Sequence, residues 1–328
     1  MPLAFFRAVG DFFSKLAEVH FGALAIGLLC FAIYLTIRSR AAYNILRAAY
    51  PEQPIEFKRI WGAYLAAYGF NNVIPARGGD VIRLFLTKTS VANSSYPAIA
   101  AATFVEMVFD ASMAVFILTF AFTQGVFPKP PDFASLGSFD IAFFAGHFQF
   151  TLFLLTLLGV LVLVGFAVLS RRVKAFWARV RQGLTILRDR RRYFREVWLV
   201  QLGGWCFRFA AFWFLLDAFG VGGSVKNVLL VLGVNAVAAV VPFTPGGAGV
   251  QQAFLVKVFA GTASGATVAA YSVGQQIAIG GFTLAVGFVL LAVVFRFRSF
   301  KDVIAAGKAD RAGGAAPTAD PGVPRARA

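Results

Sequence analysis

Runs of uncharged, mostly apolar residues alternate with short charged segments along the 328-residue chain. Apolar runs that are long enough to cross a bilayer as helices occupy 21–37, 95–123, 141–170, 197–217 and 258–295. The last run is too long for one span, so we expect a turn at Gly261–Gly265 and a final helix over about 265–296.

Two other runs, 60–76 and 227–256, are interrupted by proline and glycine. Non-helical backbone at membrane depth is tolerated only against protein or water. Both runs therefore predict broken or re-entrant elements. The whole pattern predicts an all-α, polytopic membrane bundle of about six to eight hydrophobic helices that contains these two broken elements.

The pattern also predicts how the chain is divided. We expect an interfacial amphipathic helix at 1–20, because its aromatic and apolar residues recur at helical spacing. The remaining segments are a first membrane half at 21–170, a basic cytoplasmic loop at 171–196, a second membrane half at 197–297 and a disordered cytoplasmic tail at 298–328.

Composition supports a membrane protein, since 59% of the residues are hydrophobic and only 14% are charged, against about 25% charged in soluble domains. The net charge of +16 is concentrated in 38–59, 171–196 and 296–328. Basic residues that flank apolar runs mark cytoplasmic segments. We therefore expect a multi-pass cytoplasmic-membrane protein with these segments and its C-terminus inside. Nucleic-acid binding is disfavoured, whereas anionic lipid headgroups are the expected partner of 171–196.

The two broken elements resemble each other. GFNNVIPARGGDVIRLFL (69–86) and GVNAVAAVVPFTPGGAGVQQAFL (233–255) both carry Gly-x-Asn, then Pro, then Gly-Gly, then an apolar stretch that ends Phe-Leu. Three predicted spans separate them, so the second enters the membrane from the opposite face if each element returns to its own side. That is the arrangement of inverted-repeat transporters, whose broken helices form the substrate site near the midplane. Chance similarity between glycine-rich segments is the alternative.

Arg77, Asp80 and Arg83 follow the first Pro and share one helix face by their spacing of three. Charges at membrane depth cost about 2.5–3.5 kcal/mol on insertion scales, so they normally pair or serve a site. Arginine beside a helix N-terminus, here near Gly78, suits phosphate. The alternative is a topological anchor at the interface.

Glu106 and Asp110 lie four residues apart in one apolar span and share a face. Three roles are open for them: partners of Arg77 or Arg83, proton acceptors in coupled transport, or neither. The second motif offers Pro245, Gly246 and Gly247, whose backbone amides either cradle an anion or allow close helix packing.

Several polar amides sit in apolar surroundings. Asn72 and Gln275 flank the two motifs and are expected in a headgroup cavity, although hydrogen bonding between helices is the alternative. Arg208 is expected to pair with an acid on another helix. Only two cysteines and two isolated histidines are present, so we expect no metal or cofactor.

The signature over 72–83, together with Pro242-Phe243-Thr244-Pro245-Gly246-Gly247-Ala248-Gly249-Val250, resembles one family over roughly 20–297. It is similar to the flippase-like membrane domain of lysylphosphatidylglycerol synthases. The resemblance implies handling of a lipid and its movement between leaflets. Asp80 stands where the family usually has Glu, and Met107 where it often has Arg. The aminoacyl-transferase domain of the full-length synthases is not expected in this chain.

We therefore expect a transporter that binds and flips a phosphate-bearing lipid, either a phospholipid or a polyprenyl phosphate. Arg77 and Arg83 would hold the headgroup, while Asp80, Glu106 and Asp110 balance charge. One alternative is a membrane-embedded transferase or hydrolase with one of these acids as base. Another is a non-transporting partner of a lipid-modifying enzyme, and a homo-oligomer is also compatible with the sequence.

Overall fold

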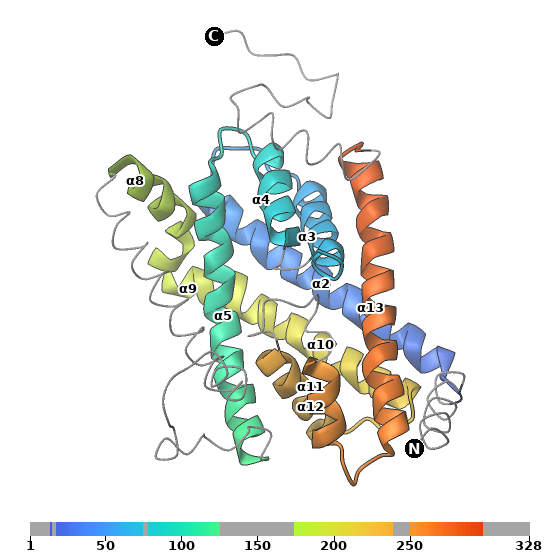
Figure 1. The fold of residues 1–328 in the computed structure, drawn as a ribbon. Coiled ribbons are helices and arrows are strands. Elements are labelled where there is room, and N and C mark those ends of the chain that lie inside the picture. The colour runs from blue at the N-terminus through green and yellow to red at the C-terminus, as the bar shows by residue number, and fades with distance from the viewer. Residues whose placement is uncertain (1–13, 15–17, 75–77, 125–173, 239–249, 298–328) are drawn as a thin grey trace, which may run out of the picture.

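The computed structural model describes residues 14, 18–74, 78–124, 174–238 and 250–297, and these ranges are helical (Figure 1). Within them, four helices are long and apolar enough to cross a membrane: Phe21–Ala49, Tyr96–Phe120, Arg190–Ala218 and Gly265–Val294. A polytopic helical membrane protein is therefore confirmed. Most of the predicted helix at 1–20, the span at 141–170 and the tail at 298–328 lie outside the described residues, so the total of six to eight helices stays a prediction.

The first half contains α2 (Phe21–Ala49), α3 (Phe57–Asn71), α4 (Gly78–Ser90) and α5 (Tyr96–Thr123). As predicted, the run at 60–76 does not continue as one helix. The amides of Asn72 and Val73 bond back to the carbonyls of Gly69 and Phe70, 3.2 and 3.0 Å away. These bonds close the last turn of α3, and α4 then packs back along α3 as a hairpin.

Close approach of α4 to α3 depends on Gly79. A Cβ at this position would collide with the carbonyl oxygen of Ala67 and with the backbone and side chain of Asn71. Backbone atoms cannot rotate away, so only glycine lets the first turn of α4 lie directly on α3. The second glycine of the Gly-Gly pair thus has a packing role.

The second half contains α10 (Leu199–Ala218), α11 (Val225–Ala238), α12 (Val250–Val258) and α13 (Gly265–Val294). The predicted turn before the last helix is confirmed: Gly261 has φ +88°, and Ser264 caps α13 by accepting a hydrogen bond from the Thr267 amide at 3.1 Å. The second motif falls largely at 239–249, which lies outside the described residues.

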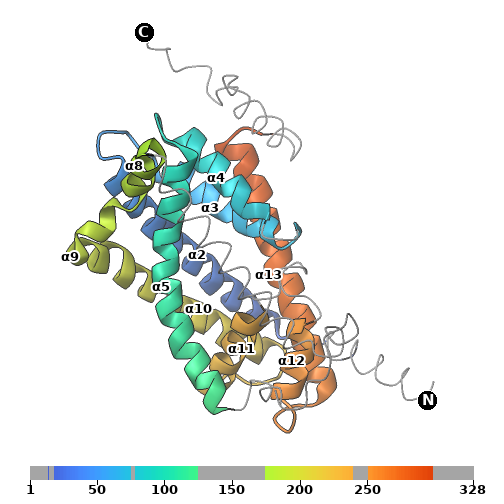
Figure 2. The same ribbon diagram turned by 60° about the vertical axis from the view of Figure 1, so that its left-hand side comes forward.

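The two halves have matching positions around the centre of the molecule. Figures 1 and 2 show α2 and α10 side by side through the middle, α5 and α13 on opposite sides, the α3–α4 hairpin at one end and α11 with α12 at the other. The contacts follow the same pattern, because α3 of the first half packs on α13 and α11 of the second half packs on α5.

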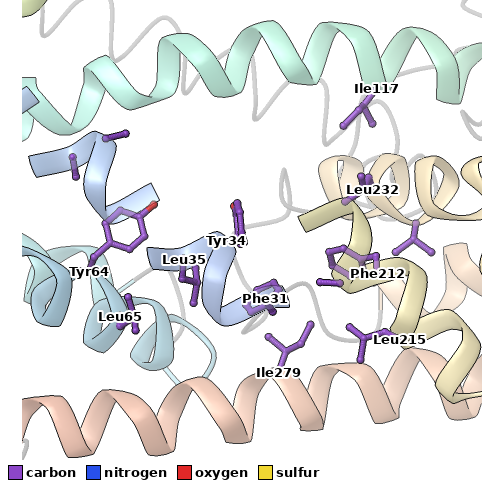
Figure 3. Packing of buried hydrophobic residues seen from close by; sticks show 14 of the residues in the cluster. Phe31, Tyr34, Leu35, Tyr64, Leu65, Ile117, Phe212, Leu215, Leu232 and Ile279 are labelled. Atoms are coloured by element: carbon purple, nitrogen blue, oxygen red, sulfur yellow. The ribbon is translucent and has the colours of Figure 1, made fainter. Parts of the chain in front are cut away.

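A single large hydrophobic core joins the halves. Figure 3 shows Phe31 of α2, Phe212 and Leu215 of α10, and Ile279 of α13 turned toward one another. Ile117 of α5 and Leu232 of α11 extend the same cluster. Every long helix contributes to this core, and the outer helices α5 and α13 pack around the central pair α2 and α10.

Two segments that the sequence places in loops are helical. α2 continues through Arg38 to Ala49, because Ala41, Ile45 and Leu46 keep an apolar face buried after the charges begin. The described part of 171–196 consists of α8 (Lys174–Gly183), a 3₁₀ turn at Thr185–Arg188, α9 (Arg190–Tyr193) and the start of a π-helix at Phe194–Trp198 that leads into α10.

We predict that Gly79→Ala destabilises the folded protein by about 1–3 kcal/mol, because the added methyl group overpacks the α3–α4 contact. Gly281→Ala in α13 is the matched control, since a Cβ there would meet nothing within 4 Å. Thermal unfolding of the detergent-purified proteins compares the two. An unchanged melting temperature for Gly79→Ala would contradict the packing role of this glycine.

Candidate functional site

The predicted site residues divide into those the structure describes and those it does not. Arg77, Pro245, Gly246 and Gly247 lie outside the described residues, and their roles stay predictions. The others lie on four helices or at their ends: Asn72 after α3, Asp80 and Arg83 on α4, Glu106 and Asp110 on α5, and Gln275 on α13.

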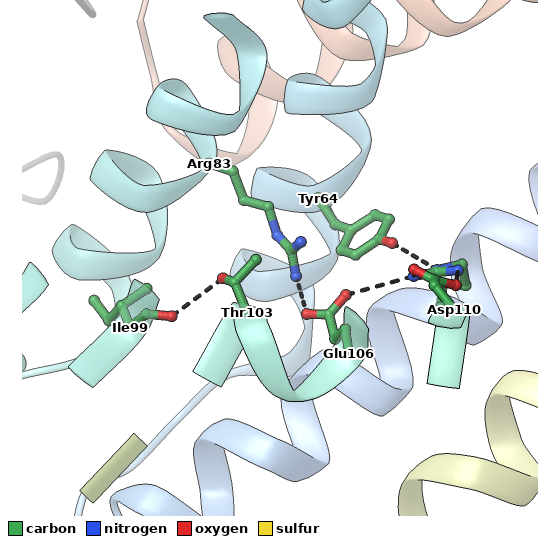
Figure 4. A network of polar contacts seen from close by, with 7 residues as sticks. Tyr64, Arg83, Ile99, Thr103, Glu106 and Asp110 are labelled. Atoms are coloured by element: carbon green, nitrogen blue, oxygen red, sulfur yellow. Dashed lines mark hydrogen bonds and ion pairs between the residues drawn. The ribbon is translucent and has the colours of Figure 1, made fainter. Parts of the chain in front are cut away.

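Arg83 and Glu106 form an ion pair between α4 and α5 (Figure 4). Arg83 Nη2 donates to Glu106 Oε1, and only 4% of the Glu106 surface is exposed. The guanidinium of Arg83 also lies over the Tyr64 ring, 4.2 Å from its centroid. The buried carboxylate therefore lies against the cation that compensates it, and Tyr64 of α3 covers the pair.

Arg38 of α2 forms the second pair, with Asp110. Its Nη1 and Nη2 donate to the two carboxylate oxygens at 2.5 and 2.7 Å, in the parallel geometry that suits guanidinium and carboxylate. Its Nε donates to the Tyr64 hydroxyl at 2.9 Å, and Nη2 lies 3.9 Å from Glu106 Oε2. Arg38 is only 7% exposed, so it joins both acids inside the bundle.

Together these four charges form one compensated cluster. Glu106 and Asp110 share a face of α5, as predicted from their spacing, and Arg38 reaches both of them. Two arginines and two ionised carboxylates have no net charge, which lowers the cost of burying each member. The cluster connects α2, α3, α4 and α5.

Asp80 and Asn72, the other described site residues of the first motif, form hydrogen bonds around the break between α3 and α4. Asn71 Nδ2 donates to Asp80 at 2.9 Å, across the break between α3 and α4. Asn72 Nδ2 donates to the Tyr68 carbonyl and to Thr283 Oγ1 of α13, both at 3.1 Å. Asn72 therefore bonds between helices, the alternative to a place in the headgroup cavity.

The second half carries a neutral contact at a comparable place. Gln252 Nε2 of α12 donates to Gln276 Oε1 of α13 at 2.7 Å. Gln275 is buried beside it, and its Oε1 has no hydrogen-bond partner among the described residues. The predicted acid partner of Arg208 is not found in the described part of the chain, where its guanidinium lies over aromatic rings instead.

Sequence reasoning missed Arg38 and Tyr64. Arg38 directly follows the uncharged run that ends at Ile37, which placed it in a loop. The continuing apolar periodicity at Ala41, Ile45 and Leu46 is the signal that assigns it to a helix. Tyr64 is one tyrosine in an apolar run, and nothing in the sequence separates it from a packing residue.

Two cavities are lined by described residues outside the cluster. One, of about 210 Å³, is lined by Leu35 and Thr36 of α2, Trp61 and Leu65 of α3, and Thr283 of α13. The other, of about 350 Å³, lies at the start of α5 and is lined by residues that include Lys88, Ser95, Arg179 and Gln182. The described residues contain no group of acids, histidines and cysteines that could hold a metal ion.

We predict that Arg83→Gln and Glu106→Gln each destabilise the protein by about 3–5 kcal/mol, because each leaves a buried charge unpaired. The double variant should lose less than the sum of the two, which a double-mutant cycle of thermal or denaturant unfolding measures. The half-exposed pair Arg192–Glu196, 3.0 Å apart, is the control and should couple by under about 1 kcal/mol. Additive losses at Arg83 and Glu106 would contradict a coupled buried pair.

The comparisons with known proteins agree with this helical arrangement. No curated protein and no solved structure matches the chain. Residues 3–287 match the family described as the lysylphosphatidylglycerol synthase TM region, which covers the membrane helices and most of the N-terminal segment. The chain therefore belongs to the lysylphosphatidylglycerol synthase transmembrane-region family.

Proposed function

We propose that this protein binds a phosphate-bearing lipid and moves it between the leaflets of the cytoplasmic membrane. The observation that carries the proposal is the buried cluster of Arg38, Arg83, Glu106 and Asp110, inside apolar helices and next to a broken helix. Intramembrane charges are rare, and they normally mark a substrate or ion pathway. Membership of a lipid-synthase membrane family makes a lipid the favoured substrate.

The cluster provides a way to exchange partners. A lipid phosphodiester carries one negative charge, as a carboxylate does, and also accepts two parallel hydrogen bonds from arginine, so it can replace Glu106 on Arg83 without leaving a cation unpaired. Glu106 keeps a second cation nearby, because Arg38 Nη2 lies 3.9 Å from its other oxygen. Arg77, six residues before Arg83 in the sequence, would add a further positive charge for the incoming headgroup.

The matching positions of the two halves support an inverted repeat. α2–α5 would correspond to α10–α13, since the two central helices, the short helix pairs at the two ends and the two outer helices occupy exchanged places (Figure 1). The spans Phe21–Ala49 and Arg190–Ala218 are 29 residues long each. Arg38 in the first span and Arg208 in the second lie at nearly the same distance from the start of the span. When positions are counted from the Gly-Gly pair of each motif, and one extra residue is allowed in the second motif, Glu106 corresponds to Gln275. Rocking of one half against the other would then expose the interior to each leaflet in turn.

The basic segment fits a supporting role at the cytoplasmic surface. Arg179 and Gln182 of α8 face Lys88 and the start of α5 across the larger cavity. Two cations beside a helix N-terminus attract anionic headgroups. In this proposal the segment concentrates anionic lipid near the α3–α4 hairpin and keeps the basic side of the protein inside.

The direct test reconstitutes the purified protein into phosphatidylcholine vesicles with a trace of tail-labelled fluorescent phosphatidylglycerol. If the protein moves lipid, dithionite bleaches label from both leaflets, whereas protein-free vesicles lose only the outer-leaflet signal. Arg77→Ala should abolish movement without loss of folding, and Arg47→Ala, an exposed arginine at the end of α2, should not. Bleaching limited to the outer leaflet with the wild-type protein would overturn the function. Unchanged movement with Arg77→Ala would overturn the site assignment.

A further inference from the structure

A row of hydrogen-bond donors on α10 has no acceptor among the described residues. Gln201, Trp205 and Arg208 are spaced by four and three residues, which places them on one helix face. Gln201 Nε2 and Trp205 Nε1 are buried without a hydrogen-bond partner among the described residues, as is the acceptor Gln201 Oε1. In the described part of the chain, the guanidinium of Arg208 contacts only the faces of aromatic rings.

Three rings surround that guanidinium. Its Cζ lies 4.7 Å from the Trp205 ring centroid, 5.6 Å from that of Tyr34 and 6.0 Å from that of Phe212. Ring faces attract a cation, but they accept none of its five N–H groups. Arg208 is therefore held in place in an apolar span while its hydrogen-bonding capacity is unused within the described structure.

This arrangement differs from that of the other arginines inside the bundle. Arg38 and Arg83 donate to carboxylates of α5, whereas α13, the corresponding helix of the second half, carries no acid. Buried donors normally have partners, and those without one need a physical explanation. Two such donors on the same helix face as Arg208 indicate an acceptor-rich anion.

The row continues the charged cluster of the first half. The Tyr34 ring that lies beside Arg208 also lies 5.9 Å from the guanidinium of Arg38. Arg83, Arg38 and Arg208 thus follow one another from the α3–α4 hairpin through α2 to α10. A phosphate that leaves the first two arginines would meet the third without crossing a wholly apolar region.

We propose that Arg208, with Trp205 and Gln201, is a phosphate-binding subsite for the lipid, because no carboxylate among the described residues pairs with Arg208. The inference deepens the proposed function and rests on it. A lipid phosphodiester is favoured over free phosphate because Phe207 and Leu199, beside the row, expose apolar side chains that suit acyl chains. Arg208 and Trp205 are both partly exposed, whereas Gln201 is buried.

The test measures lipid-dependent stabilisation of the full-length protein in a neutral detergent. Phosphatidylglycerol should raise the melting temperature of the wild type in a concentration-dependent way, and diacylglycerol or inorganic phosphate should not. Arg208→Gln should weaken the apparent affinity roughly ten- to hundredfold, the loss of one charge-assisted contact. Arg47→Gln is the matched control, because Arg47 also lies over a tyrosine ring, 5.8 Å from its centroid, but at the exposed end of α2.

A second readout covers the case in which Arg208→Gln does not fold. The emission of Trp205, isolated by comparing the wild type with Trp205→Phe, should change with phosphatidylglycerol and not with diacylglycerol. No change in Trp205 emission, or an unchanged affinity of Arg208→Gln, would overturn the subsite. An equal response to inorganic phosphate would overturn its assignment to a lipid.

These outcomes are separable from those of the vesicle test. Binding through Arg208 without movement of labelled lipid would support the subsite and overturn the transport function. Movement of lipid with an unchanged affinity of Arg208→Gln would support the transport function and overturn the subsite.

Discussion

The cost of burying charge in apolar helices is the constraint on which the rest of the structure depends. Arg38, Arg83, Glu106 and Asp110 each come from a segment that lies within or against a membrane-spanning helix, where an unpaired charge costs about 2.5–3.5 kcal/mol on insertion scales. Their pairing fixes α4 and α2 against α5, and Tyr64 adds α3 to the same contact. The position of the broken hairpin is therefore set by electrostatics as well as by the glycine contact that holds α4 on α3.

The two halves use similar helices with different chemistry. The first half neutralises its arginines with its own carboxylates, whereas the second has an amide pair, Gln252 and Gln276, and an arginine surrounded by rings. In the proposed mechanism, this difference in charge compensation determines where the phosphate can bind. A first half without net charge in its cluster is stable without substrate, and Arg208, which has no carboxylate partner among the described residues, is available to bind the phosphate. The phosphate would pass from Arg83 and Arg38 to Arg208. The anion would then stay paired with a cation as it crosses the low-dielectric interior.

The sequence predicted those features of the fold that depend on residues close together in the chain. The membrane class, the interruption after Asn71, the start of α4 at Gly78, the turn at Gly261 and the shared face of Glu106 and Asp110 all follow from runs, breaks and spacing. Long-range contacts could not be predicted in this way. The pairing of Arg38 with Asp110 requires knowing that α2 extends beyond its uncharged run and packs beside α5. The interhelical bond of Asn72 depends on Thr283, which is far away in the sequence.

The central claim is that this bundle holds a phosphate-bearing lipid in its interior. Mass spectrometry of the lipids that stay bound to the protein after purification tests it most directly. The account predicts a phosphate-bearing lipid retained at about one molecule per chain and depleted in Arg208→Gln relative to Arg47→Gln. Retention of phosphate-free lipids only, or the same retained lipids in both variants, would contradict it.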